Sequence, residues 1–589
     1  MGTFFDDASL AFLPIGAAGK DGKAYSIKPT NGSGDFTFAR GSNLAATRIG
    51  PKPNYYIEKG RENLLTESNN FSDSDWSKTN ATMTSGQSGY DGTSDAWKFE
   101  AASAGTTQLA QNEAVSADTP TTLSVYAKSG NADFLKFIIA CSGSNSIVTF
   151  DLSDGSTSNN ARNISVNAED VGDGWFRCSA TAAPSTDITQ LRFEVRSAVD
   201  SSSADAGSYI FIQDAQFELG LVATAPIESG ASAGKAGLLE DEPRFNYSVS
   251  ATCPSLLFEP QRTNVVTDSE YFGAWNVSRA SITHNATTSP EGLANAAALT
   301  EDTTNNSHPL NNTFSVSSGA EHTLTIFAKQ GSRRYLALLA NNGGSTIYYD
   351  LQEKTAGSGG SVEDYGNDWL RLIYTYTTNS TSAEIDILPS INGSSIVYTG
   401  DGSNAVFLYG AQIEAGGYPT SYIPTYGGSS VTRSADDMTT TFSSALATNG
   451  SATIFFHELG VYDSDDITTS GGRYRYQKDS NNYVSLTTTA AAWRVRIQSG
   501  STSNFKTLSD HPKTDAVKIA VVVSSTNFSI FANGVKETDN QALAATADFS
   551  SIDGFLTSIQ DGVGARRAVQ QVVFPTALTD SECIALTTL

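Results

Sequence analysis

Two long stretches of the chain match one another, and this internal repeat constrains the fold more than any other feature. Asn63 and Asn264 stand in matching segments at an offset of 201 residues. Four further blocks match in the same order: 123–130 with 324–331, 150–152 with 349–351, 174–177 with 368–371, and 212–220 with 408–416. Such a series indicates tandem copies of one domain. Each copy is about 170 residues long, so each should bury its own core.

Short apolar alternations between turn formers predict an all-β chain. Leu123, Val125 and Ala127 alternate with polar neighbours, as in a strand with one buried face. Asp-Gly and Asn-Gly turns recur between such strands. With roughly eight strands, each copy is predicted to be a jelly-roll β-sandwich. We expect Trp175 and Trp369 to fill cores, the alternative being platforms that stack on sugars.

The repeat divides the chain into five parts. They are an N-terminal attachment segment (1–57), jelly-roll repeat 1 (58–230), a linker and leader strand (231–261), jelly-roll repeat 2 (262–437) and a third, different β unit (438–589). The first part has too little apolar material for a core, so we expect it to lie against repeat 1, a neighbouring subunit or a particle. Near the C-terminus, Thr579 and Glu582 have the spacing of a helix capping box.

Charge and composition exclude several classes of partner. With 37 Lys and Arg against 62 Asp and Glu, the net charge is −25, and such a body repels nucleic acid and anionic membranes. The alternative interpretation is a charged coat that keeps a long β protein soluble. The sequence shows no signal peptide, no apolar run of 18 residues and no CxxC spacing. We therefore expect a soluble protein made in a reducing cytoplasm, without membrane insertion.

No catalytic motif stands out, so the sequence predicts a protein that is not an enzyme. The five histidines lie neither near a serine elbow nor at metal-ligand spacing. A polysaccharide depolymerase would need two opposed carboxylates, and chance acidic pairs are expected among 62 acids.

Binding chemistry is concentrated in the third unit. Its two strands at 473–476 and 493–497 alternate, so that Trp493 and other apolar residues face one side. The opposite side would carry Arg473, Arg475, Arg494 and Arg496. On adjacent strands these form a basic patch suited to carboxylate or phosphate groups of a surface glycan. The alternative is a row of arginines paired with local acids on a solvated sheet.

Several segments resemble bacteriophage virion proteins of the tail-fibre and head-fibre kind. The resemblance rests on 35–48, 243–247 and 253–264, which look like a leader to a carbohydrate-binding-module-like jelly roll, and on 410–425, which looks like its end. In this chain the leader is divided, its halves standing before different repeats. Residues 451–586 are similar to laminin-G and concanavalin-A-like sandwiches.

The resemblance implies a function and a possible metal. It implies a virion tail-fibre subunit, commonly a homotrimer, which attaches to other virion proteins through its N-terminal segment and binds a host surface glycan. The alternatives are a head fibre or capsid decoration, a depolymerase, and a secreted bacterial adhesin, which the missing signal peptide opposes. Jelly rolls of this kind often hold a structural calcium near the first and last strands. Glu67 and Asp214 stand near such positions in repeat 1, and Asp268 and Gly410 in repeat 2.

Overall fold

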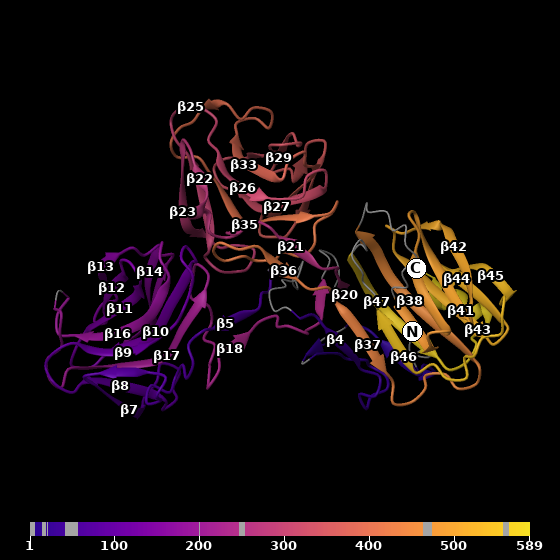
Figure 1. Cartoon of the computed structure of the whole chain (residues 1–589), viewed down its shortest axis with the longest axis horizontal. Coiled ribbons are helices and arrows are strands. Elements are labelled where there is room, and N and C mark those ends of the chain that lie inside the picture. Colours follow the sequence, from indigo (N-terminus) through magenta and orange to yellow (C-terminus); the bar gives the residue numbers. More distant parts are fainter. Residues whose placement is uncertain are drawn as a thin grey trace.

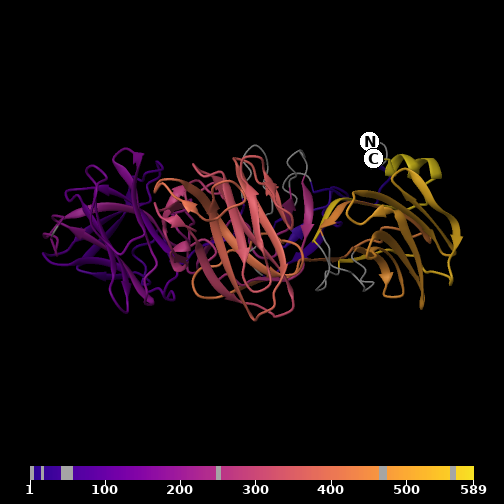
Figure 2. The same cartoon turned by 90° about the horizontal axis from the view of Figure 1, so that it is seen from above.

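The chain folds into three β-sandwiches, with the first and third at opposite ends and the second between them (Figures 1 and 2). The computed structural model describes residues 6–14, 19–20, 22–41, 57–199, 201–246, 254–462, 474–557 and 565–588. Apart from a short 3-10 helix, η1 (Phe272–Ala274), and one α-helix, α2 (Asp580–Thr587), its named elements are strands. No helix in this part of the chain is long and apolar enough to cross a membrane. The predicted all-β fold is confirmed.

The first sandwich contains two six-stranded antiparallel sheets, more strands than the sequence led us to expect. One sheet has the order β14 (Ser165–Gly172), β15 (Trp175–Ala182), β10 (Thr121–Ser129), β17 (Tyr209–Leu219), β8 (Ala96–Ala101), β7 (Ala81–Gln87). The other has the order β13 (Thr157–Ala161), β12 (Ser146–Asp151), β11 (Phe134–Cys141), β16 (Ile188–Arg196), β9 (Thr107–Gln111), β6 (Ser77–Thr79). Alternate residues of both sheets, such as Leu123 and Phe193, form the core between them.

The second sandwich repeats this plan. One sheet has the order β23 (Ala280–Thr287), β24 (Ala296–Glu301), β35 (Ala405–Ala415), β27 (Glu321–Gln330), β32 (Trp369–Thr377), β31 (Gly360–Asp364). The other has the order β22 (Asn276–Val277), β26 (Leu310–Ser315), β33 (Ser382–Ser390), β28 (Tyr335–Ala340), β29 (Thr346–Asp350), β30 (Thr355–Ala356). Short two-stranded pairs complete the two sandwiches: β5 (Arg61–Asn63) with β18 (Gly234–Ala236), β21 (Arg262–Asn264) with β36 (Val431–Arg433), and β25 (Asn305–Asn306) with β34 (Tyr398–Thr399).

Matched asparagines show why the repeat persists in the sequence. The amide of Asn63 donates to the carbonyls of Ala215 (3.0 Å) and Ile227 (2.9 Å), which ties the start of the first sandwich to its end. Asn264 donates in the same way to Ala411 (3.2 Å) and Ile423 (2.8 Å) in the second. Each side chain is fully buried, so its hydrogen bonds must be satisfied within the protein.

The tryptophans matched between the repeats are buried, as expected of core residues. Trp175 and Trp369 are each 2% exposed. Trp175 packs with Tyr126 and Ala96, and Trp369 packs in a cluster that includes Phe327. Sugar stacking would need an exposed ring face, so the packing interpretation holds for both.

The third sandwich takes strands from three separate parts of the chain. One sheet has the order β19 (Arg244–Asn246), β20 (Ser255–Phe258), β47 (Ala565–Phe574), β38 (Ser451–Tyr462), β43 (Val517–Ser524), β44 (Asn527–Ala532), β45 (Val535–Ala542), with β1 (Leu10–Phe12) also beside β47. The other has the order β2 (Gly19–Lys20), β3 (Lys23–Ala24), β4 (Phe36–Ala39), β37 (Asp437–Thr441), β46 (Gly554–Thr557), β39 (Tyr474–Asp479), β40 (Asn482–Thr488), β41 (Ala492–Ser499), β42 (Thr502–Pro512). Both chain ends therefore lie at this sandwich (Figures 1 and 2).

This arrangement differs from the expected division of the chain. The described part of 1–57 was expected to form a separate segment, yet its β1 and β4 pair with β47 and β37. Phe12 and Phe36 are fully buried in the core of the third sandwich. The leader strand β20 pairs with β47 of the same sandwich. The physical reason is that these short apolar strands cannot bury a face alone, whereas the two open sheets of the third unit can cover them.

Helix α2 closes the chain as the sequence predicts. The hydroxyl of Thr579 accepts from the backbone N–H of Glu582, and the Glu582 carboxylate accepts from the Thr579 N–H at 2.7 Å. This reciprocal capping box satisfies two backbone donors at the helix start.

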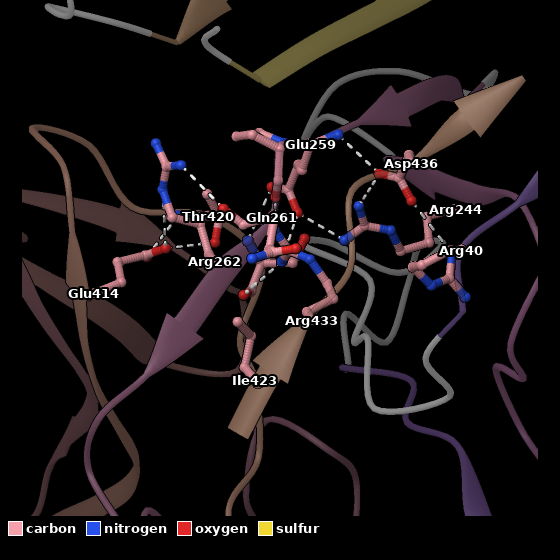
Figure 3. A network of polar contacts seen from close by, with 12 residues as sticks. Arg40, Arg244, Glu259, Gln261, Arg262, Glu414, Thr420, Ile423, Arg433 and Asp436 are labelled. Atoms are coloured by element: carbon pink, nitrogen blue, oxygen red, sulfur yellow. Dashed lines mark hydrogen bonds and ion pairs between the residues drawn. The ribbon is translucent and has the colours of Figure 1, made fainter. Parts of the chain in front are cut away.

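A buried cluster of charges joins the second and third sandwiches (Figure 3). Arg244 pairs with Glu259 at 2.6 Å and also with Asp436. Arg433 pairs with Glu259 at 2.9 Å, and Arg40 with Asp436 at 3.5 Å. All five side chains are 0% exposed. The cluster therefore fastens the N-terminal segment, the leader and the connector after repeat 2 at one point.

We predict that Phe36→Ala destabilises the third sandwich by about 3–5 kcal/mol, because it leaves a cavity in a close-packed core. Hydrogen exchange of the β37 and β46 amides measures this loss. Ile27→Ala, at a side chain 44% exposed, is the control and should cost less than about 0.5 kcal/mol. Equal effects of the two variants would mean that the N-terminal segment is not part of this core.

We predict that Asp436→Asn destabilises the junction by about 3–5 kcal/mol, because it leaves buried arginines without their counter-charge. Hydrogen exchange in β20 and β37 measures the effect. The control is Asp364→Asn, which removes the partner of Lys354 in a pair that is about 40% exposed and should cost less than about 1 kcal/mol. A loss at Asp436 as small as that of the control would contradict a role in holding the sandwiches together.

Candidate functional site

The outer face of strands β39 to β42 in the third sandwich carries the candidate site. Strand alternation buries Tyr474, Trp493 and Val495 in the core and turns Arg475 and Arg494 to the other side. The predicted separation of apolar and arginine faces is therefore confirmed for the described residues. Trp493 is 0% exposed, and its indole N–H donates to the carbonyl of Asp515 at 3.1 Å. It is a core residue, as expected.

The arginines lie in cross-strand rows. Arg475 on β39 is opposite Ser485 on β40, Ser485 is opposite Arg496 on β41, and Arg496 is opposite Phe505 on β42. The expected adjacent strands are thus separated by β40, which places Arg475 and Arg496 roughly 10 Å apart, two strand spacings. Arg494 lies two residues along β41, on the same face.

Two aromatic rings lie between the guanidinium groups. The guanidinium carbon of Arg475 is 4.0 Å from the ring centroid of Tyr483, and that of Arg496 is 5.4 Å from the same ring. Arg494 and Arg496 lie 4.8 and 5.5 Å from the ring centroid of Phe505. Phe505 is 47% exposed. We call Arg475, Arg494, Arg496, Tyr483 and Phe505 the arginine face.

Hydrogen bonds donated to neutral acceptors hold these arginines in place. Arg496 donates to Gln498 Oε1 and Ser503 Oγ, each at 3.0 Å. Arg494 donates to Thr487 Oγ1 at 3.1 Å, and Arg475 to the carbonyl of Asp479 at 3.2 Å. These contacts orient the guanidinium groups without neutralising them.

The charge of the arginine face is not neutralised within the part of the chain that the structure describes. There, no carboxylate lies within 4.0 Å of the guanidinium nitrogens of Arg475, Arg494 or Arg496, although other arginines of the chain form such pairs. Desolvation lowers the pKa of Arg475 and of Arg494, and repulsion from Arg496 lowers both further, while electrostatic interactions with Tyr483 and Asp479 partly offset this for Arg475. Within the described residues these arginines therefore form no close ion pair with a local acid, and an anionic ligand would relieve their repulsion.

The sequence predicted only part of this face. Arg473 lies outside the described residues. Tyr483 and Phe505 were not predicted as part of the face, although both lie on strands with period-two alternation. Their position beside the arginines depends on the order of strands in the sheet, which a single sequence does not give.

A buried ammonium group of the chain lies near the first and last strands of the second sandwich. It belongs to Lys59, which precedes β5, and its Nζ lies 2.7 Å from Glu270 and 2.9 Å from Glu291. It also donates to the hydroxyls of Tyr409 (3.1 Å) and Tyr426 (3.0 Å). Glu270 follows the first strand of the sandwich and Tyr409 stands in its last strand β35. The lysine side chain is 2% exposed.

The residues expected to hold calcium do not fit a metal in the described part of the chain. No group of three or more His, Cys, Asp or Glu side chains there is placed to hold one. In the first sandwich, Glu67 accepts a hydrogen bond from Asn70 at 3.1 Å, and Asp214 accepts one from Tyr90 at 3.1 Å. Burial, with repulsion from neighbouring acids, raises the pKa of Asp214 to about 6. In the second, Gly410 offers no side chain, and burial raises the pKa of Asp268.

Comparisons with known proteins leave the family open. No protein-family model and no curated protein matches the sequence. One solved structure with a likeness is the IT-sialidase CBM40 of Ruminococcus gnavus bound to α2,3-sialyllactose, at 14% identity and a TM-score of 0.20, covering 24% of this chain and 84% of that one. Another is domain 4 of AbnA, an arabinanase of Geobacillus stearothermophilus, in complex with arabinotriose. It has 14% identity and a TM-score of 0.21, and the match covers 26% of this chain and 73% of that one.

A third likeness is to the receptor-binding domain of botulinum neurotoxin D, at 8% identity and a TM-score of 0.22. It covers 26% of this chain and 40% of that one. At such identities and scores, these likenesses assign neither a family nor a ligand to the chain.

We predict that Lys59→Met destabilises the second sandwich by about 3–5 kcal/mol, because Glu270 and Glu291 lose their buried counter-charge. Denaturant unfolding at neutral pH measures the loss. The control is Lys98→Met, at a partly exposed pair with Glu100, which should change stability by less than about 1 kcal/mol. A loss at Lys59 as small as that of the control would contradict the role of its charge.

Proposed function

We propose that the chain is a non-enzymatic subunit of a bacteriophage virion appendage, of the tail-fibre kind, whose third sandwich binds anionic glycans of the host surface. The virion role rests on the resemblance of the leader and jelly-roll segments. The glycan-binding role rests on the arginine face.

The observation that carries the binding proposal is the set of Arg475, Arg494 and Arg496 without a carboxylate partner in the described residues, beside an exposed aromatic ring. Guanidinium groups bind carboxylate and phosphate groups through paired hydrogen bonds. Aromatic rings such as that of Phe505 contact the apolar faces of sugar rings. In a protein with a net charge of −25, a local group of three arginines also directs an acidic ligand to this face.

The proposed attachment segment and the proposed glycan-binding face belong to the same sandwich. The third sandwich lies at one end of the molecule (Figure 1). Attachment to other virion proteins, proposed for 1–57, then involves this sandwich too, because the described part of that segment belongs to it. A homotrimer would present three arginine faces and strengthen weak single-site binding. In the alternative, a head fibre or capsid decoration, the same sandwiches protrude from the capsid, and antibody labelling of particles would separate the two.

We predict that the full chain binds acidic polysaccharides, with colominic acid, alginate and wall teichoic acid as probes and dextran as the neutral comparison. In the double variant Arg494→Gln, Arg496→Gln, the affinity should fall on the order of tenfold or more, because charge-assisted hydrogen bonds are lost. Isothermal titration at low and high salt measures the affinity. Uronate binding should weaken at low pH as the ligand carboxylates protonate.

The matched control for this experiment is Arg334→Gln, which removes one charge from an ion pair with Asp350 in the second sandwich. Its affinity for the acidic probes should equal that of the unchanged chain. Equal affinities of the double variant and the control, or no binding to any acidic probe, would contradict the proposed glycan site.

A further inference from the structure

A cleft of about 440 Å³ lies between the first and second sandwiches. One wall is the outer face of β14 and β15 in the first sandwich, and the other contains Asn285, Leu293 and Ala294 of the second. Val222 and Ala223, from the chain that follows β17, line it as well. Figure 1 shows β14 and β23, which carries Asn285, facing one another across this junction. Ligand sites often lie at such domain interfaces, with volumes in this range.

The wall from the first sandwich is a ladder of polar side chains. Three cross-strand pairs line the cleft in succession: Ser165 with Thr181, Asn167 with Ser179, and Glu169 with Arg177. Hydroxyl, amide and charged groups thus alternate along one face. One carboxylate and one guanidinium give this wall no net charge, which favours an uncharged ligand with many hydroxyl groups.

The opposite wall supplies apolar contacts. Leu293 and Ala294 present the apolar surface. Beside them, the amide nitrogen of Asn285 donates to Ser165 Oγ at 3.0 Å and to the carbonyl of Leu221 at 2.8 Å, which links the two sandwiches. These hydrogen bonds hold the two walls of the cleft in a defined position.

The second repeat shows that the shared fold does not require a polar residue at the position of Ser179. There, Ile373 stands opposite Ser361 on β31 and β32, at the positions of Ser179 and Asn167. Ile373 is 7% exposed, and Arg371, which matches Arg177, is fully buried. The same strand pair is therefore closed and partly apolar in one copy, whereas it is open and polar in the copy that faces the other sandwich.

We propose that this cleft binds a neutral saccharide of one or two units, with its hydroxyl groups on the β14–β15 ladder and its apolar face against Leu293. The site is separate from the arginine face, which lies in the third sandwich. Occupation of the cleft also bridges the first and second sandwiches, because ligand groups contact both.

Saturation-transfer NMR of the full chain with maltose, lactose and cellobiose tests the proposal. At least one of the three should give a signal, and Leu293→Trp, which fills the cleft, should abolish it. The matched control is Ile391→Trp, which introduces the same side chain at a position of the second sandwich that is 45% exposed and outside the cleft, and it should leave the signal unchanged. The double variant Asn167→Ala, Ser179→Ala, which alters a partly exposed face, should weaken binding on the order of tenfold.

Two further results decide between the sites. The signal should persist in the Arg494→Gln, Arg496→Gln variant, so that loss of acidic-glycan binding and loss of cleft binding are told apart. No signal from any of the three disaccharides with the unchanged chain, or a signal undiminished in both Leu293→Trp and the Asn167, Ser179 variant, would overturn the proposal.

Discussion

The three-sandwich arrangement depends on the buried charges of Glu259 and Asp436, which are shared among Arg40, Arg244 and Arg433 (Figure 3). Burying ions costs free energy that their attraction only partly returns, so such a cluster is weak evidence for net stability. Its consequence here is geometric. The five residues come from three segments of the chain, and pairing their charges fixes how these segments lie relative to one another. Desolvation lowers the pKa of Arg40 to about 10, which still leaves it charged near neutral pH.

The path of the chain explains why such a junction is needed. The chain begins in the third sandwich, leaves to form the first, returns through β19 and β20, leaves again to form the second, and then completes the third. Both jelly rolls are thus insertions between strands of one sandwich. The divided leader has the same origin, because its halves are strands of that sandwich rather than two starts of a jelly roll. Such long-range strand pairings are slow to form, since the intervening chain must be ordered or looped out first.

The two repeats keep the interactions that close each sandwich and differ in what they offer at their surfaces. Asn63 and Asn264 make the same pair of hydrogen bonds, and the fold needs them because they satisfy buried backbone carbonyls. By contrast, the second repeat has a buried lysine, Lys59, between Glu270 and Glu291, near its first and last strands. Residues that precede the first sandwich therefore complete the second. The Glu169–Arg177 pair of the ladder recurs as Glu363 and Arg371, whereas Ser179 is replaced by Ile373. Duplication has preserved the framework and changed the sites.

The sequence by itself determined the fold class, the tandem repeat, the capping box at Thr579 and the alternation that separates Trp493 from Arg494, because each depends on local spacing or on an internal match. Only the tertiary structure decided that Phe36 belongs to the third sandwich, that β40 lies between the arginine strands, and that Lys59 is buried between Glu270 and Glu291 of the second sandwich. The physical reason is that strand alternation fixes which face a side chain takes, whereas the neighbour of a strand is chosen by whichever open sheet can cover its apolar face, however distant in the chain.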